Sequence, residues 1–363
     1  MIRSFRFYQE DKLIRYFSKI LLRSRLYCGD IGMGNFSEKE RDMSDTLPGN
    51  CIRGHHHITI ATGDAQEDYD FHTKVLGLKN VKKTAFYDGA TPIYHLYYGN
   101  DLGSESSLIT SFPVAHTGVK GKKGTGQISY VALSIPVDAM SFWVERLKNH
   151  GFEVEECERF GETYLNFKHP CGVDYALVGV DEDSRVPYSS GPVTSELMIR
   201  GTHSVGVSTR DFEFMGEFME LGWGGTRLVE DGNLIRYVVG NQGSGAIVDF
   251  IVEPDRKPGS WIVGEGTVHH MAFDVDSHQE QNNLKFYLEG LGYTDVSEVK
   301  DRGYFDSIYV RTPSGALFEA TVSHNDGFTC DESVDNLGID VMVSPQLELS
   351  REELMAEIGY LRD

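Results

Sequence analysis

The chain has 363 residues, 40% of them hydrophobic, which is enough apolar material for more than one core. Its 55 Asp and Glu residues outnumber its 34 Lys and Arg residues, and a net charge of -21 disfavours binding to nucleic acid or to an anionic membrane. Five cysteines without a CxxC pair argue against a disulfide framework, and no apolar run has the length of a membrane span. We therefore expect a globular protein of the cytoplasm.

The first fifty residues differ in character from the rest of the chain. They are basic within an acidic protein, through Arg3, Arg6, Lys12, Arg15, Lys19, Arg23 and Arg25. A transit peptide would be poor in acidic residues, whereas Glu10 and Asp11 lie within this segment. The other interpretation is an over-extended gene start, with Met33 or Met43 as the initiator. We treat residues 1–50 as an appended, disordered segment.

Four similar units follow from residue 54 onward and recur about every 70 residues. Each begins with a strand pattern: HHHITIAT from His55, ISYVALSI from Ile128, THSVGVST from Thr202 and VHHMAFDV from Val268. An amphipathic helix follows each strand and ends at a glycine suited to a helix C-terminus, namely Gly77, Gly151, Gly222 and Gly292. Strand-like stretches with turns complete each unit. The pattern predicts four βαβββ units.

The order of the units predicts the domain organisation. Units 1 and 2 would form an N-terminal domain at residues 51–195, and units 3 and 4 a C-terminal domain at residues 196–330. Residues 331–363 would be a tail. Within it, Ser350 precedes Glu352 and Glu353, which indicates a short capped helix.

In each unit, one position on the first strand and one on the last strand can face the inside of a curved sheet. The first strands offer His57, Tyr130, His203 and His270, and the last strands offer Thr110, Ala176, Asp249 and Glu319. Pairing unit 1 with unit 4 would join His57 to His270 and Glu319, whereas pairing unit 3 with unit 4 would join His203 to the same two residues. Either set is a two-histidine, one-carboxylate triad, which holds Fe(II) or Mn(II) and leaves coordination sites open. The spacing does not choose between them.

Four βαβββ units are typical of the vicinal oxygen chelate superfamily, which the chain resembles over residues 54–325. The segments GHHHITIATG, VKKTAFYDG, PIYHLYYGN, GEGTVHHMAF and RGYFDSIYVRTPSGALFEA are similar to those of hydroquinone 1,2-dioxygenases. The resemblance implies an α+β fold with two cupped mixed β-sheets and outer helices. It also implies an enzyme that opens a hydroquinone ring, substituted or chlorinated, with O2. An extra His55 and the N-terminal extension depart from the family pattern.

The resemblance assigns roles to eight residues. The metal ligands would be His57, His270 and Glu319, holding Fe(II), with Mn(II) as the alternative, and the residues around them would be His56, Thr59, His269, Arg302 and Tyr309. His269 is the candidate base, Arg302 would stabilise negative charge on oxygen, and Tyr309 would position or protonate an oxygen intermediate. Because successive side chains of a pleated strand alternate, His56 and His269 should point away from the metal unless their strands are bulged.

Three other functions share this fold and stay open from the sequence. A catechol extradiol dioxygenase would use His203, a glyoxalase-like isomerase would need a fourth protein ligand, and a metal-free drug-binding protein would need no triad. The expected partners are a small aromatic diol and dioxygen, with no nucleic acid and no membrane. Assembly into a homo-oligomer is a further possibility.

Overall fold

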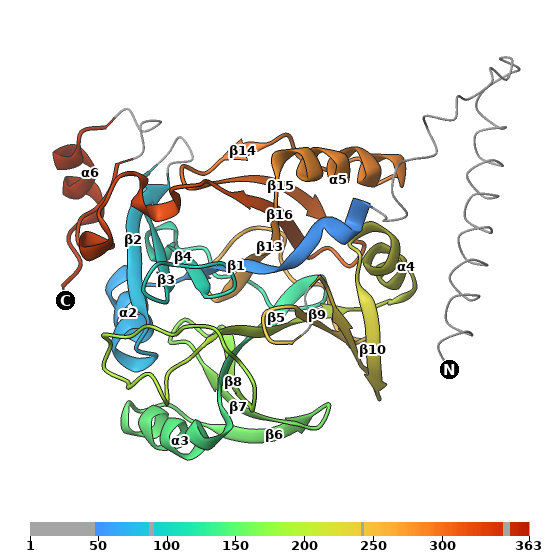
Figure 1. Ribbon diagram of the computed structural model, residues 1–363, viewed down its shortest axis with the longest axis horizontal. Coiled ribbons are helices and arrows are strands. Elements are labelled where there is room, and N and C mark those ends of the chain that lie inside the picture. The colour runs from blue at the N-terminus through green and yellow to red at the C-terminus, as the bar shows by residue number, and fades with distance from the viewer. Residues whose placement is uncertain (1–47, 87–90, 241–242, 344–348, 363) are drawn as a thin grey trace, which may run out of the picture. The chain divides into compact units, whose positions relative to one another are not determined.

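The computed structural model describes residues 48–86, 91–240, 243–343 and 349–362. Of the predicted disordered segment, residues 1–50, the part up to residue 47 lies outside these ranges, and residues 48–50 belong to a short 3₁₀ helix (Pro48–Cys51). In the described part, the chain forms two sheets of eight strands each, and residues 47–363 make one compact unit (Figure 1). The four predicted βαβββ units are present in order, so the predicted fold is confirmed.

The first sheet combines unit 1 with unit 4. Unit 1 comprises β1 (Ile52–Thr62), α2 (Ala65–Asp70), a π-helical turn (Phe71–Val75), β2 (Lys79–Phe86), β3 (Ile93–Gly99) and β4 (Leu108–Pro113). Unit 4 comprises β13 (Thr267–Val275), α5 (His278–Gly290), β14 (Lys300–Asp301), β15 (Phe305–Arg311) and β16 (Leu317–Ser323). The strand order is β14-β15-β16-β13-β1-β4-β3-β2, so the antiparallel pair of β1 and β13 joins the two units at the centre.

The second sheet repeats this plan with units 2 and 3. Unit 2 comprises β5 (Gln127–Pro136), α3 (Met140–Asn149), β6 (Glu155–Arg159), β7 (Glu162–Lys168) and β8 (Asp174–Val180). Unit 3 comprises β9 (Gly201–Thr209), α4 (Glu213–Glu217), a π-helical turn (Phe218–Gly222), β10 (Thr226–Asp231), β11 (Leu234–Val238) and β12 (Ile247–Val252). The order β10-β11-β12-β9-β5-β8-β7-β6 again places the first strands of two units side by side.

The sheets do not follow the predicted boundary between residues 195 and 196. Each sheet takes strands from both sides of that boundary, and β8 and β9, which flank it, belong to the same sheet. The division into residues 51–195 and 196–330 therefore stays a prediction about the sequence and does not coincide with the division into sheets.

Helix α5 packs against β13 and β16 of the first sheet. Helix α5 begins at the N-cap Ser277, whose hydroxyl accepts a hydrogen bond from the Glu280 amide, and it buries Leu284 and Leu288. Figure 1 shows α5 beside β15 and β16. Three of the four predicted terminal glycines have a positive φ, but Gly222 is the last residue of its π-helical turn, and Gly224 takes the left-handed conformation instead.

The C-terminal segment packs against the first sheet. Lys82 on β2 is fully buried, and its ammonium group donates to Asp331, Glu332 and the Phe328 carbonyl. The predicted helix after Ser350 is present as α6 (Arg351–Ile358), and Ser350 and Glu353 form a capping box. The segment after residue 330 is thus attached to the fold through a buried ion pair.

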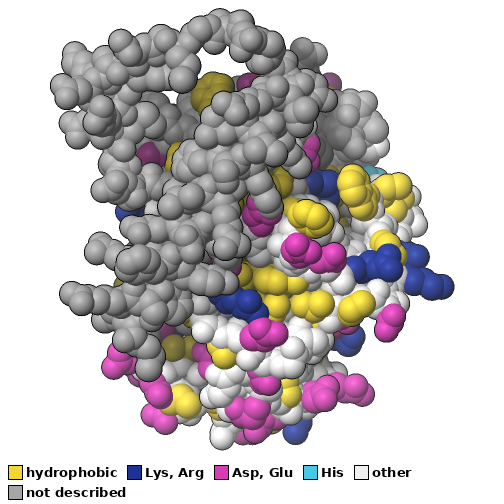
Figure 2. All heavy atoms as spheres, turned by 90° about the vertical axis from the view of Figure 1, so that its right-hand side faces the viewer, with side chains coloured by type: hydrophobic (Ala, Val, Ile, Leu, Met, Phe, Trp, Pro, Cys, Tyr) yellow, Lys and Arg dark blue, Asp and Glu magenta, His cyan; other side chains and the backbone are white. Residues whose placement is uncertain are grey.

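Figure 2 shows acidic side chains interspersed with hydrophobic and basic ones on one face of the molecule. None of the helices in the described ranges has the length and hydrophobicity that crossing a bilayer requires.

Candidate metal centre

Three ligand-type side chains converge inside the first sheet. His57 comes from β1, His270 from β13 and Glu319 from β16, and all three are at least 95% buried. The two histidine Nε2 atoms lie 3.1 Å apart, and the Glu319 Oε2 atom lies 2.7 Å from His270 Nε2 and 3.8 Å from His57 Nε2. Because the sheet pairs unit 1 with unit 4, the structure assembles this triad and not the one built on His203.

Two β-bulges place the neighbouring histidines on the same side as the triad. On β1, His55 pairs with Phe273 and His57 with Ala272, so His56 is an extra residue. On β13, the partners of Thr59 and Ile60 are His270 and Val268, so His269 is skipped in the same way. The alternation expected for a regular strand is therefore interrupted at both positions.

The bulges bring each neighbour into contact with a ligand histidine. The Nδ1 atoms of His56 and His57 lie 2.8 Å apart, and those of His269 and His270 lie 2.7 Å apart. If each ligand histidine donates its Nδ1 proton to its neighbour, its Nε2 lone pair faces the centre of the triad. This is the tautomer that a metal ligand requires.

Glu319 has one oxygen fixed and one free. Its Oε1 accepts hydrogen bonds from the hydroxyls of Ser307 and Thr321, whereas its buried Oε2 has no hydrogen-bond partner among the described residues. A buried carboxylate oxygen without a donor is costly unless a cation neutralises it. The unpartnered oxygen and the two facing imidazole nitrogens fit a divalent metal ion.

Burial and mutual interactions shift the pKa values of these groups. Burial tends to raise the pKa of Glu319, but the positive charge that His270 and His57 can carry outweighs it and holds the pKa well below its usual range. Burial lowers the pKa of His57 strongly and that of His269 to about 3. The centre therefore favours an ionised Glu319 carboxylate and a neutral His57 imidazole, which are the protonation states for metal binding.

The other predicted residues lie around the triad. The Thr59 hydroxyl is 2.8 Å from His270 Nε2 and 2.6 Å from the Thr110 hydroxyl. Tyr309 lies opposite Glu319 in the sheet, with its ring centre 5.7 Å from that of His270. The Arg302 Nε donates to the Tyr309 hydroxyl at 3.0 Å. All eight predicted residues thus gather at one place.

Several residues that surround the triad were not predicted from the sequence. His95 on β3 contacts Thr110 through Nε2 at 3.3 Å, and its Nδ1 lies 2.9 Å from the Tyr97 hydroxyl. The rings of Phe112 and Phe305 lie 4.4 Å from His95 and 5.0 Å from His57 respectively. The segment PIYHLYYGN, which contributes His95, carried a signal, but nothing in that segment alone shows which side chain faces the metal.

The corresponding cup in the second sheet is filled by an arginine. There, β9 has a bulge at His203. The residue equivalent to His270 is therefore Ser204, whereas the sequence alignment of the units predicted His203. Arg236 occupies the position equivalent to Tyr309 and donates to both oxygens of Asp249, at 2.7 and 2.9 Å. His203 instead approaches Glu162, with 3.2 Å between Nε2 and Oε1.

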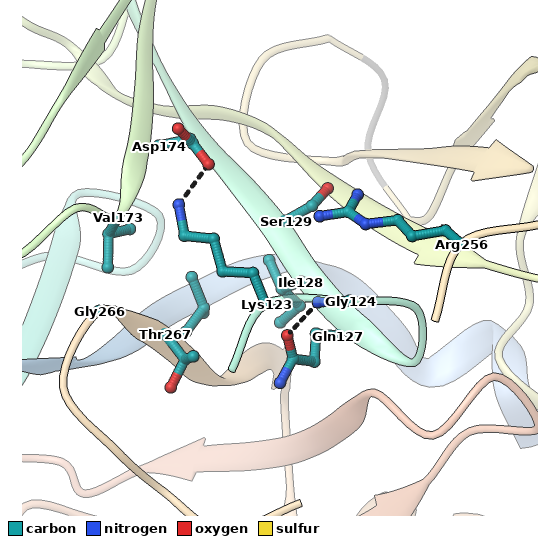
Figure 3. Close-up of a pocket in the computed structure, with 11 residues that line it drawn as sticks. Lys123, Gly124, Gln127, Ile128, Ser129, Val173, Asp174, Arg256, Gly266 and Thr267 are labelled. Carbon is teal, nitrogen blue, oxygen red and sulfur yellow. Dashed lines mark hydrogen bonds and ion pairs between the residues drawn. The ribbon is translucent and has the colours of Figure 1, made fainter. Parts of the chain in front are cut away.

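A further small pocket between the sheets lies away from the triad (Figure 3). It is lined by the start of β5, the start of β8 and the first residues of β13. Figure 3 shows Lys123 reaching Asp174 and the Gln127 side chain bonded to the Gly124 amide, so its polar groups pair with one another.

Known proteins are similar to this chain in sequence and in fold. The family model of the glyoxalase/bleomycin resistance protein/dioxygenase superfamily matches residues 54–176. The chlorohydroquinone/hydroquinone 1,2-dioxygenase of Sphingobium indicum is 49% identical over 307 residues, which cover 84% of this chain and 95% of that protein. The chain belongs to the ring-cleaving dioxygenases of this superfamily.

Other members of the ring-cleaving dioxygenase family agree in sequence and in structure. MhqO of Bacillus subtilis, provisionally named a ring-cleaving dioxygenase, is 33% identical over 83% of this chain and 94% of its own length. The crystal structure of a provisionally named dioxygenase from the same species superposes with a TM-score of 0.80 at 32% identity, covering 86% of this chain and 98% of that one. Maize glyoxalase I, at 13% identity and a TM-score of 0.54, shares the fold alone, over 85% of this chain and 97% of its own. The family and the fold imply a bound metal.

Proposed function

We propose that the protein opens the ring of a hydroquinone with dioxygen, using Fe(II) held by His57, His270 and Glu319. The observation that carries the proposal is the convergence of two imidazole nitrogens and one unpartnered carboxylate oxygen in a buried cup. Similarity to a hydroquinone 1,2-dioxygenase supports the substrate class. Mn(II) has the same ligand preferences and is the alternative ion.

The three ligands would hold the metal on one face. A redox-active ion with open coordination sites supplies the activation of dioxygen and the polarisation of a substrate hydroxyl. His56 and His269 would hold the ligand histidines in the required tautomer through the Nδ1 contacts at 2.8 and 2.7 Å. The Ser307 and Thr321 hydroxyls would orient Glu319 so that Oε2 faces the ion.

The contact between His269 and His270 bears on the role of His269. If His269 Nδ1 accepts the proton of His270 Nδ1, the neutral His269 ring carries its own proton on Nε2. That nitrogen then donates a hydrogen bond instead of accepting a proton. We therefore propose that His269 stabilises negative charge on a substrate oxygen, in place of the base role expected from the sequence.

Tyr309 and Arg302 would act as a pair. Because the Tyr309 oxygen accepts a hydrogen bond from Arg302, its own proton is available to another acceptor. Burial raises the pKa of Tyr309, and the nearby Glu319 charge raises it further, so the phenol stays protonated. The pair would place a neutral donor and a permanent positive charge beside the oxygens of the bound reactants.

The wall of the cup suits a flat aromatic ring. Phe112 and Phe305 provide apolar surfaces, while His95 and Tyr97 supply polar groups at its edge. Thr110 stands where a fourth charged ligand would be needed for a glyoxalase-like site, which favours the dioxygenase. The catechol-type triad would need His203, which lies in the other sheet.

The test is metal-dependent dioxygen uptake. The protein is stripped with a chelator and reloaded anaerobically with Fe(II), Mn(II) or Zn(II), and oxygen consumption is followed with hydroquinone and with catechol. We expect activity with Fe(II), none with Zn(II), which has no redox chemistry, and a higher kcat/KM for hydroquinone. Activity restored by Zn(II) would refute the oxidative reaction, and a higher kcat/KM for catechol would refute the substrate class.

A further inference from the structure

A second group of ligand-type side chains is buried away from the candidate metal centre. Asp68 lies on α2, His72 on the π-helical turn that follows it, and His169 in the turn between β7 and β8. All three are at least 98% buried, and one potential ligand atom of each lies within 4.8 Å of the others. The proposed reaction uses none of these residues.

The charge of this group is unbalanced. Among the described residues, Asp68 forms ion-pair contacts with His72 and His169 only. A buried carboxylate with only histidines beside it needs a proton or a metal ion to neutralise it.

Two atoms of the group lack hydrogen-bond partners. Asp68 Oδ2 accepts hydrogen bonds from the Tyr98 and Ser111 hydroxyls, but its Oδ1 has no partner among the described residues. His169 Nε2 also has none, although it lies only 3.2 Å from Asp68 Oδ1. His72 Nδ1 lies 3.4 Å from the same Asp68 oxygen.

These separations match those around a small tetrahedral ion. With metal–ligand bonds of about 2.0 to 2.1 Å, tetrahedral zinc separates its ligand atoms by about 3.3 to 3.4 Å. The two distances from Asp68 Oδ1, 3.2 and 3.4 Å, are close to this edge length. We propose that Asp68, His72 and His169 form a second divalent-cation site, structural in role, which takes zinc or an ion of similar preference.

The surroundings supply the tautomers that such a site requires. Without an ion, His72 Nδ1 donates its proton to the Asp68 backbone carbonyl at 3.0 Å. Binding an ion through Nδ1 would break this bond and place the proton on Nε2, which lies 3.1 Å from the Tyr175 hydroxyl. His169 Nδ1 lies 2.9 Å from Cys171 Sγ, which accepts its proton when Nε2 binds the ion. The Cys171 amide, 3.1 Å from the same Nδ1, would stabilise the opposite tautomer when no ion is bound.

The location indicates a structural role and not a catalytic one. The His72 ring stacks on Tyr98 at 4.2 Å, and the Phe71 ring lies 4.4 Å from that of His169, so aromatic rings enclose the ligands. Asp68 and His72 belong to unit 1, which is part of the first sheet, and His169 belongs to unit 2, which is part of the second. An ion bound here would link the two sheets.

The test uses the full chain without its candidate metal centre. In a His57→Ala/Glu319→Ala variant, reloaded with Zn(II) or Co(II) after chelation and desalting, we expect about one tightly bound ion per chain. Adding Asp68→Asn should abolish this binding. The matched control is Asp306→Asn, which alters the exposed Asp301, Asp306 and His324 cluster and should leave the count unchanged. Binding lost only with Asp306→Asn would overturn the proposal.

A second measurement covers the case in which Asp68→Asn does not fold. In the His57→Ala/Glu319→Ala background, saturating Zn(II) should raise Tm on the order of 5 °C, and a chelator should reverse the rise. Co(II) bound there should show the intense visible absorption of tetrahedral coordination. The absence of both the Tm shift and stoichiometric binding would leave a proton as the neutralising group and refute the site. Neither result depends on whether the protein cleaves hydroquinones.

Discussion

Replacing His57 and His203 separately by alanine distinguishes the two possible metal cups. Both histidines lie on the first strand of a unit, and they are 2% and 1% exposed, so each substitution should cost a similar free energy of unfolding, about 1 to 3 kcal/mol. Only His57 faces His270 and Glu319, whereas His203 faces Glu162 in the other sheet. The pair therefore separates metal binding from general destabilisation.

The expected difference in metal affinity is large. Loss of a residue that merely orients a ligand weakens metal binding by about 10 to 100-fold, so loss of one of three ligands should exceed that range. We expect His57→Ala to lose most of its iron and its dioxygen uptake, and His203→Ala to retain both. Iron content, turnover and Tm are measured on the same preparations. If His57→Ala keeps iron and turnover while His203→Ala loses them, the assignment of the triad is wrong.

Three further substitutions test other parts of the structure. Arg236→Met removes the cation that pairs with the buried Asp249, and it should lower the free energy of unfolding, measured by chemical denaturation, by about 3 to 5 kcal/mol without changing the metal content. Loss of iron from this variant would contradict the placement of the metal in the first sheet alone. Tyr309→Phe should lower kcat about 10 to 100-fold at constant iron content, and an unchanged kcat would exclude it as a donor. Burial, aided by Glu105 and Asp276, raises the pKa of Asp274 to about 6. Between the pKa of Asp274 in the unfolded chain and its pKa in the folded protein, only the folded protein keeps this carboxyl protonated. The free energy of unfolding therefore falls as the pH rises through this window. Asp274→Asn should remove this fall and raise the free energy of unfolding at pH 7 by about 1 to 2 kcal/mol, after allowance for the partial exposure of Asp274. A pH dependence of stability like that of the unmodified protein would contradict this prediction.

The repeat pattern predicted most of the fold because each unit carries local signals. The apolar strand from His55 and the turn residues Pro313, Ser314 and Gly315 are features of neighbouring residues, and these three residues lie between the paired strands β15 and β16. The positions of Thr110, Ala176, Asp249 and Glu319 on the last strands are also equivalent in the sheets.

The errors have one physical cause, which is the bulged strand. A bulge adds a residue to one strand relative to its partner, and the partner of β1 lies some 210 residues away in the chain. An alignment of the units cannot show which residue is extra, so His203 was matched with His270 in place of Ser204. His56 and His269 were uncertain for the same reason. The pairing of unit 1 with unit 4 is likewise non-local and needed the family resemblance.

The buried group at Asp68 was not found from the sequence because its members come from different units. Asp68 and His72 are spaced by one helical turn, which is common on any helix. His169 is distant in the chain and follows an ordinary strand. Only the packing of α2 against the turn after β7 brings the three together.

Arg236 in the second cup shows how a buried carboxylate at the centre of such a sheet can be neutralised without a metal ion. The carboxylate on the last strand, Glu319 in one cup and Asp249 in the other, needs a positive charge opposite it, and the chain meets that need in two ways. A guanidinium is covalently part of the protein and cannot be lost, whereas a metal ion exchanges with its surroundings. Removal of the metal ion proposed for the first cup would therefore leave the buried Glu319 charge uncompensated, whereas the ion pair of Arg236 and Asp249 would be unaffected.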